Sequence, residues 1–406
     1  MRDLAVAVAA ACSVGFAAYL WSVRRRRCCH ASHLGLRADG VIFTGTGCSS
    51  GLPLVQCTLS VPHSSCTACR PALQGGPANK NWRGNVGALI RFTDPGGVVR
   101  HIQIDCGKTF RDTVMLRVYR EHGIQFIDAL LLTHDHADAV GGIDEVRALQ
   151  KFDPVTFEID TPIRVLCDRR TLTRLRHMYP YLHPKRPGAL AFAQSALVCK
   201  ACELDWEPPP GAAAPSASPA PSRTTPPTAA APSADGGGVK RFVAKIDWEA
   251  FGGGALEQVS AVDIHGLEIT CLPVWHGEDY ISFGFGWGPE HARVVYLSDY
   301  TALCPSTEAL LTSWASQGSI ALLVLDALRM SGAHPVHATG DESIELARRL
   351  RPTQALLVGM GHSMEHEATN QQLHRLKQEG LDIQLAFDGQ FVPLELSASA
   401  RASCEG

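Results

Sequence analysis

The chain of 406 residues lacks an excess of positive charge. Its 37 lysines and arginines are outnumbered by 40 aspartates and glutamates, so the formal net charge is −3. Bulk electrostatic attraction to nucleic acid is therefore not implied, and an RNA contact would need a local basic patch. No internal repeat of useful length occurs either, which argues against a repeat architecture.

A dinucleotide-binding fingerprint is also absent. The turn Gly45-Thr46-Gly47 follows a strand expected at 41–43, but the next glycine, Gly51, comes one residue too late for the G-x-G-x-x-G pattern. We therefore interpret this segment as a tight turn.

Signs of a disulfide scaffold are weak, although the chain has 14 cysteines. With 45% hydrophobic and 19% charged residues, the chain can build a core without cross-links. Reduced thiols or metal ligands are the favoured interpretation of the cysteines.

The N-terminal segment lacks charge over residues 4–23, a length that could cross a bilayer as a helix. Four arginines, 24–27, follow at once. We expect a hydrophobic anchor or targeting segment at 1–23 and a basic, polar linker at 24–40. The positive-inside rule would then keep the catalytic body on the cytosolic side. The alternative is an alanine-rich organelle-targeting segment that is cleaved off.

Beyond the linker, the pattern predicts alternating strands and helices and hence a layered α/β architecture. Strand-like runs lie at 41–43, 86–92, 101–104 and 127–133, and helical periodicity lies at 109–122, 171–178 and 341–350. Residues 207–238 consist almost entirely of Pro, Ala, Ser, Thr and Gly, which predicts a flexible insertion. Because candidate metal ligands lie on both sides of it, we expect one interrupted domain at 41–398 and a tail at 399–406.

The strongest chemical signal is a hydrophobic run that leads directly into His134, His136 and Asp138. Imidazole nitrogens and carboxylate oxygens suit zinc, and also iron or manganese, and a strand end holds such ligands on a rigid base. Three ligand-type side chains within five residues therefore predict a metal site.

This segment resembles the H-x-H-x-D-H signature of the metallo-β-lactamase superfamily, whose other motifs follow in order. The matching segments are Ile104-Asp105-Cys106-Gly107, Pro273-Val274-Trp275-His276-Gly277, Tyr296-Leu297-Ser298-Asp299 and Gly359-Met360-Gly361-His362. The resemblance covers residues 41–396 and implies an αββα four-layer sandwich. It further implies that His134, His136 and His276 hold one metal ion, that Asp138 and His362 hold a second, that Asp299 bridges them, and that Asp105 orients the metal loop.

One position departs from the signature, because Ala139 stands where its last histidine is expected. The second ion would then bind more weakly or be absent, so we expect one or two catalytic ions, Zn²⁺ with Mn²⁺ or Fe²⁺ as alternatives. An H-x-H-A-D-A version is itself similar to uncharacterised eukaryotic hydrolases. Together with the phosphonate-pathway cyclic phosphodiesterase they form the branch that the chain most resembles, through residues 45–51, 57–69 and 79–83.

Two further groups of residues have expected roles. His337 resembles the histidine of a histidine-threonine element in related phosphodiesterases and is our candidate general acid, with His334 as the rival. Cys66 and Cys69 form a C-x-x-C, a common half of a structural zinc site, and Cys57 precedes them. The resemblance to the phosphodiesterase implies His366 as the fourth ligand; His63 is the nearer alternative, and unpaired buried thiols are the other interpretation of the three cysteines. Another C-x-x-C, Cys199 and Cys202, is interpreted as incidental. The polar loop from Asn79 to Asn85 could meet a substrate phosphate, or it could be a solvated loop.

The leading functional hypothesis is a phosphodiesterase acting on a small or cyclic phosphodiester by means of metal-activated water. A tRNA 3′-end endonuclease is one alternative, although the only large insertion has almost no charge for an RNA-binding arm. A thioester or lactone hydrolase is another, although such members normally keep the last histidine of the signature. The non-enzymatic alternative is a metal-binding scaffold. No strong nucleic-acid signal is present, and membrane anchoring would depend on residues 4–23.

Overall fold

The computed structural model describes residues 39–59, 65–151, 153, 159, 161–183, 243–252 and 255–394. The chain divides into two units, Met1–Asp39 and Gly40–Gly406, and every element below belongs to the second. The expected anchor, the arginines, the insertion at 207–238, His63, Cys199, Cys202 and the tail lie outside the described residues. Among the described residues, no helix is both long and apolar enough to cross a bilayer.

The first sheet has seven strands in the order β15-β1-β2-β3-β4-β5-β6. The strands are β15 (Phe391–Pro393), β1 (Gly40–Gly45), β2 (Gly87–Thr93), β3 (Val99–Ile104), β4 (Ala129–Leu131), β5 (Ile163–Cys167) and β6 (Ile246–Ala250). Pairing is antiparallel from β15 to β3 and parallel from β3 to β6. The parallel half brings the carboxyl ends of β3 and β4 to the same edge, where the metal loop begins.

The second sheet has eight strands, with β11-β8-β9-β10-β12-β13-β14 in order and β7 paired to β8. The strands are β7 (Ser260–Ile264), β8 (Leu267–Trp275), β9 (Ile281–Trp287), β10 (Arg293–Leu297), β11 (Ala302–Leu303), β12 (Ile320–Asp326), β13 (Gln354–Val358) and β14 (Ile383–Leu385). Strands β10, β12, β13 and β14 run parallel to one another, so their carboxyl ends also share one edge.

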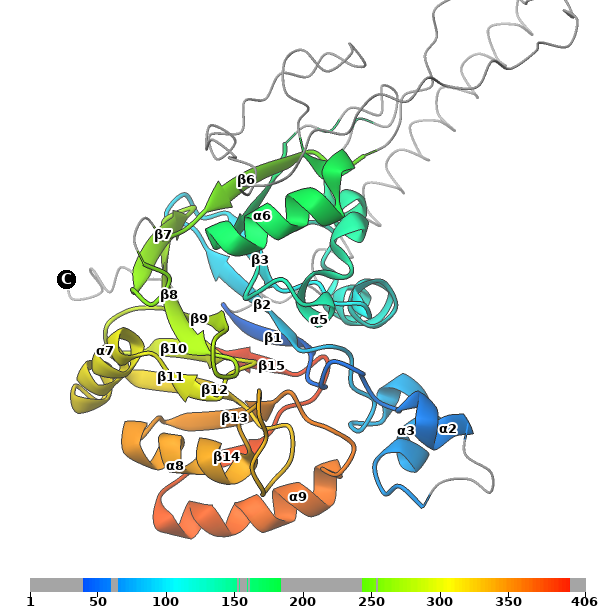
Figure 1. Ribbon diagram of the computed structural model, residues 1–406, viewed down its shortest axis with the longest axis vertical. Helices are drawn as coiled ribbons and strands as arrows, with labels where there is room; N and C mark the ends of the chain where they lie inside the picture. The colour runs from blue at the N-terminus through cyan, green and yellow to red at the C-terminus, as the bar shows by residue number, and fades with distance from the viewer. Residues whose placement is uncertain are drawn as a thin grey trace, which may run out of the picture. The chain divides into compact units, whose positions relative to one another are not determined.

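Helices cover the outer face of each sheet (Figure 1). The first sheet carries a π-helix (Phe110–Tyr119) that continues into α4 (Arg120–His122), then α5 (Ala137–Val140), a 3-10 helix (Ile143–Leu149) and α6 (Arg169–Met178). The second sheet carries α7 (Pro305–Ser316), α8 (Gly340–Leu350), α9 (His366–Leu373) and a 3-10 helix (His374–Glu379). Short helices α2 (Val55–Leu59) and α3 (Cys69–Gly75), followed by a 3-10 turn (Gly76–Ala78), lie beside the sheets.

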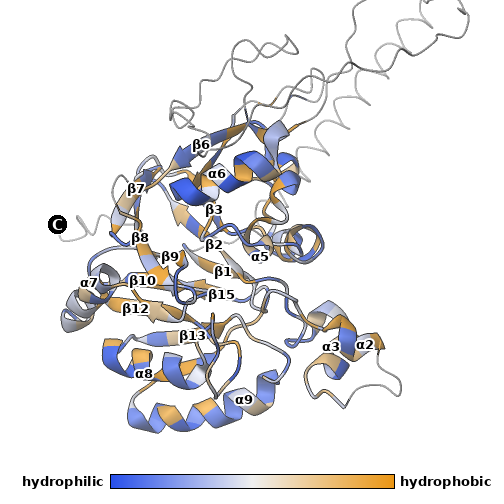
Figure 2. Ribbon diagram, in the orientation of Figure 1, coloured by the Kyte–Doolittle hydropathy of each residue, from blue (hydrophilic) through white to orange (hydrophobic). Residues whose placement is uncertain are grey.

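Three apolar cores hold these layers together. One contains side chains of both sheets, such as Phe43 and Phe285, and therefore lies between them. The second joins the first sheet to its helices, and the third joins the second sheet to α7, α8 and α9. Figure 2 shows the same division, with apolar strands at the centre and largely hydrophilic outer helices. The expected αββα sandwich is confirmed.

Most of the expected elements are present, with shifted ends. The run at 127–133 forms a strand only over β4, because Thr133 turns away to bond Asp105. Helix α6 begins two residues earlier than expected, since the Asp168 side chain accepts hydrogen bonds from the first free N–H groups. Thr339 and Glu342 form a capping box that begins α8 at 340.

Candidate metal centre

The loop after β4 is fixed by a chain of hydrogen bonds from β3. Asp105 accepts from the Thr133 N–H at 2.9 Å and from the Thr133 hydroxyl at 2.8 Å. Since that hydroxyl hydrogen is used, the Thr133 oxygen can only accept from His134 Nδ1, which lies 2.8 Å away. The proton of His134 is therefore on Nδ1, and its Nε2 presents a lone pair. Asp105 thus stands where the sequence-based interpretation expects the residue that orients the metal loop.

Three histidines, the histidine cluster, converge at the carboxyl ends of the strands. The ligand atoms of His134, His136 and His276 lie within 4.8 Å of one another. His276 follows β8, and its Nδ1 donates to the Val336 carbonyl at 2.6 Å, which leaves Nε2 for the cluster. His134 is 1% exposed, and its Nε2 has no hydrogen-bond partner among the described residues.

This donor set fits a divalent cation. Burial, followed by the neighbouring histidines, holds the pKa of His134 well below its ordinary value, and burial likewise lowers the pKa of His276 to about 4. Both rings are therefore neutral near pH 7, which is the form that binds a metal ion. A buried lone pair without a donor is costly unless a ligand meets it.

Carboxylates and a fourth histidine adjoin this cluster. Asp299 follows β10 in a left-handed conformation, with φ 48°, and its carboxylate, His276 and His337 form a second group within 4.8 Å. His337 Nδ1 lies 2.8 Å from Asp326 Oδ2 and 3.6 Å from Asp299 Oδ1. Burial opposes charge on His337, but the hydrogen bond and charge of Asp326, with the charges of Asp299 and Asp138, outweigh it and raise the pKa of His337 to about 9.

His362 lies elsewhere than expected. Its Nδ1 is 3.4 Å from Cys57 Sγ and 3.5 Å from Cys66 Sγ, and with Cys69 these residues form a cysteine cluster within 4.8 Å. We expected His362 to bind a metal ion together with Asp138, but the structure places it among the cysteines instead. Backbone N–H groups approach the sulfurs of Cys66 and Cys69 at 3.3 Å, and three thiols with one imidazole suit a tetrahedral zinc ion.

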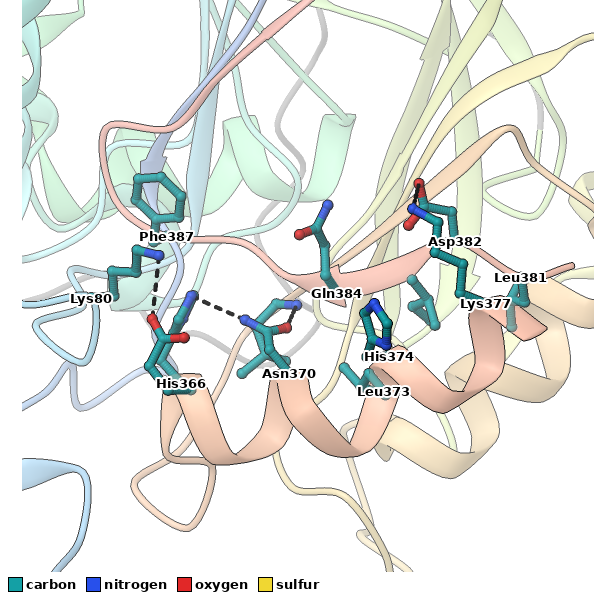
Figure 3. Close-up of a pocket in the computed structure, with 13 residues that line it drawn as sticks. Lys80, His366, Asn370, Leu373, His374, Lys377, Leu381, Asp382, Gln384 and Phe387 are labelled. Carbon is teal, nitrogen blue, oxygen red and sulfur yellow. Dashed lines mark hydrogen bonds and ion pairs between the residues drawn. The ribbon is translucent and has the colours of Figure 1, made fainter. Parts of the chain in front are cut away.

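His366, the expected fourth ligand of that cluster, is buried in another place. It begins α9, its Nε2 lies 3.1 Å from Asn370 Nδ2, and its ring packs edge-on against Phe387. Figure 3 shows His366 and Asn370 in the wall of a cavity of 330 Å³ along α9 and β14. None of its lining residues belongs to the histidine cluster or the cysteine cluster.

The loop that carries His362 is held by the buried Arg83. Its guanidinium donates to the carbonyls of Gly361 and Met364, at 3.2 and 2.8 Å, and so holds the loop between β13 and α9. Asn81 also braces this loop, donating to Glu365 at 2.6 Å and accepting from the His366 N–H at 2.8 Å. Arg83 and Asn81 of the polar loop therefore have structural roles. Both side chains are buried, so the interpretation as a solvated loop does not apply to them.

A second catalytic ion, as the resemblance describes it, would lack two side chains in this structure. Ala139 provides no ligand, and Gly359 takes the strand-end place once His362 is assigned to the cysteine cluster. A Cβ atom on Gly359 would lie 2.1 Å from Asp326 Oδ1, and its φ of +71° disfavours other residues. Asp138 is buried nearby but belongs to none of the three groups of ligand atoms.

Sequence reasoning missed several residues around this centre. Asp326 ends a strand that is otherwise apolar, and only its position at a carboxyl end could have indicated it. Tyr280 carries no motif, yet its ring adjoins His136.

His334, the rival general acid, accepts from the Val336 N–H at 3.4 Å, and its ring lies 5.3 Å from that of His337.

Fold and site together define a metal-binding centre at the strand ends of an αββα sandwich, and comparisons place it among known proteins. The family model described as "Beta-lactamase superfamily domain" matches residues 100–228. The chain therefore has the metallo-β-lactamase fold, and residues 100–228 match the domain model of that superfamily.

Solved structures share the fold. A new diphosphatase from the PhnP family has a TM-score of 0.56 and 22% identity, covering 89% of this chain and 99% of that one. The metallo-beta-lactamase fold protein YhfI from Bacillus subtilis has a TM-score of 0.50 and 12% identity, covering 88% and 99%.

A curated relative matches over a shorter stretch. It is an octanoyltransferase of Porphyromonas gingivalis (strain ATCC BAA-308 / W83), 30% identical over 146 residues, or 36% of this chain. The match spans only 24% of that relative.

Proposed function

We propose that this protein is a phosphodiesterase that uses one divalent cation, Zn²⁺ in the first place, to hydrolyse a small or cyclic phosphodiester. The observation that carries the proposal is the buried, unpartnered Nε2 of His134 in the histidine cluster, beside Asp299 and His337. The three histidines and Asp299 would hold the ion. When bound, the ion supplies Lewis acidity and makes water a stronger acid at neutral pH.

The side chains around the ion divide the remaining work. Asp105 orients the His134 ring through Thr133, which meets its Nδ1. The Val336 carbonyl accepts from Nδ1 of His276. Both rings therefore keep Nε2 available as a ligand. His337 Nδ1–H donates a hydrogen bond to Asp326, and Nε2 is therefore left to carry the proton that the leaving oxygen requires. Asp326 is fully buried and stabilises the protonated imidazole.

A phosphodiester is favoured over a thioester by this proton donor. An alkoxide leaving group needs a proton more than a thiolate does, because a thiol is the stronger acid. The PhnP-family protein that shares the fold is named a diphosphatase, and a phosphate-cleaving relative supports this choice.

Metal analysis and substrate comparison test the proposal. The purified full chain should contain two ions, one in each cluster, and hydrolyse bis(p-nitrophenyl) phosphate faster than a thioester or a lactone of matched leaving group. A clear preference for the thioester or lactone would refute the phosphodiesterase. A chain whose only ion is lost in Cys66→Ser would refute the catalytic metal centre itself.

A further inference from the structure

His136 differs from the other two members of the histidine cluster in how its ring is oriented. His134 and His276 each have one ring nitrogen fixed by a hydrogen bond, to Thr133 and to the Val336 carbonyl. His136 is exposed, and within the described part of the chain neither of its ring nitrogens has a hydrogen-bond partner. Histidine ligands are usually oriented by a group that contacts the rest of the ring.

Tyr280 is the group that meets the His136 ring. The two rings stack with centroids 4.9 Å apart and planes 20° apart. The same tyrosine is edge-on to His134 at 6.2 Å and to His276 at 5.9 Å, so one ring adjoins all three members of the cluster. Stacking against a fixed face limits rotation of an imidazole about its Cβ–Cγ bond, as a hydrogen bond would.

Tyr280 is itself held at several points. Its carbonyl accepts from the His276 N–H at 2.8 Å, which closes the turn between β8 and β9. Its hydroxyl donates to Asp135, the residue between His134 and His136, and Asp135 forms an ion pair with Arg174 at 2.8 Å. The guanidinium of Arg170 lies 3.9 Å from the centre of the ring. Helix α6 thus supports the tyrosine through two arginines.

We infer that Tyr280 is a positioning residue of the metal centre, whose stacked ring restrains the His136 imidazole and orients it toward the ion. The inference rests on the proposed metal centre. It assigns the stacking face, and not the hydroxyl group, as the part that matters for His136.

Cobalt titration of the full chain, after removal of metal with a chelator, tests this role. Co²⁺ occupies nitrogen, oxygen and sulfur sites, and its sulfur-to-metal charge-transfer band marks the cysteine cluster, so the two clusters can be followed separately. Tyr280→Leu removes the ring, and Tyr280→Phe removes only the hydroxyl. Tyr181→Leu and Tyr181→Phe are matched controls, because Tyr181 also donates to an aspartate, Asp144, at 3.0 Å.

We expect Tyr280→Leu to weaken Co²⁺ binding at the histidine cluster by about tenfold or more and to change its visible spectrum. Tyr280→Phe should lose less than about threefold, and both Tyr181 variants should match the wild type. Unchanged affinity in Tyr280→Leu would overturn the inference, and so would an equal loss in Tyr280→Phe. Wild-type protein that takes up cobalt only in the cysteine cluster would instead overturn the metal centre, and this role with it.

A measurement on the wild type covers the case in which Tyr280→Leu does not fold. The ring protons of His136 in the metal-free protein, assigned by comparison with His136→Gln, should be shifted upfield by the Tyr280 ring current. Unshifted His136 protons would show that the rings do not stack in solution, which would overturn the inference.

Discussion

The histidine cluster and the cysteine cluster are built by different means. The histidine cluster lies at the ends of core strands, and its members are oriented by Thr133, Val336 and Tyr280. The cysteine cluster lies on α2, the start of α3 and two loops, with a small apolar group and an exposed His362. A site on a complete core can lose its ion and stay folded, whereas a lobe with little core depends on its ion.

The largest effect is expected at the histidine cluster. His276→Ala removes a ligand, so kcat/KM toward a phosphodiester should fall by about 10³-fold or more. Because β8 and β9 pair along their length, the melting temperature should change little. His291→Ala, at an exposed position outside both clusters, is the control. Unfolding of the whole chain in His276→Ala would contradict the view that this site is independent of its ion.

A smaller loss is expected when only the proton donor is changed. His337→Gln should lower kcat by about 10²-fold for an unactivated alkyl diester. The loss should be much smaller for a nitrophenyl diester, because nitrophenolate leaves without a proton. Metal content should not change. His334→Gln is the matched control from the same loop. An equal loss on both substrates would remove His337 from the role of general acid.

The cysteine cluster should respond in the opposite way. Cys66→Ser is expected to lose one ion and to expose the segment around α2 and α3 to protease about tenfold faster, because that ion replaces a core there. Activity should fall by less than about tenfold, since Arg83 still holds the loop that carries His362. Cys48→Ser, outside the cluster, is the control. Loss of activity equal to that of His276→Ala would show that the two sites are not separable.

The fold and the first metal site could be predicted because their signals are local. His134 and His136 follow an apolar strand, and parallel pairing of β3 with β4 brings Asp105 to them, as the order of the motifs implied. His362 and His366 could not be assigned from spacing. Both follow β13, and the loop that carries His362 is held by Arg83, which is 278 residues earlier in the chain than Gly361. Tyr280 was missed because stacking on a ligand leaves no pattern in the sequence.

The smallest effect is expected where a ligand is put back. Ala139→His restores the last histidine of the signature, yet we expect the metal content to stay at two ions per chain, one in each cluster. Asp138 would gain one neighbour, but Gly359 still provides no side chain, because Asp326 Oδ1 fills the space of its Cβ. Since Ala139 is 2% exposed, the larger side chain should cost about 1–3 kcal/mol of stability. Ala139→Leu controls for size, and a third ion bound by Ala139→His alone would show that the second site lacks only one ligand.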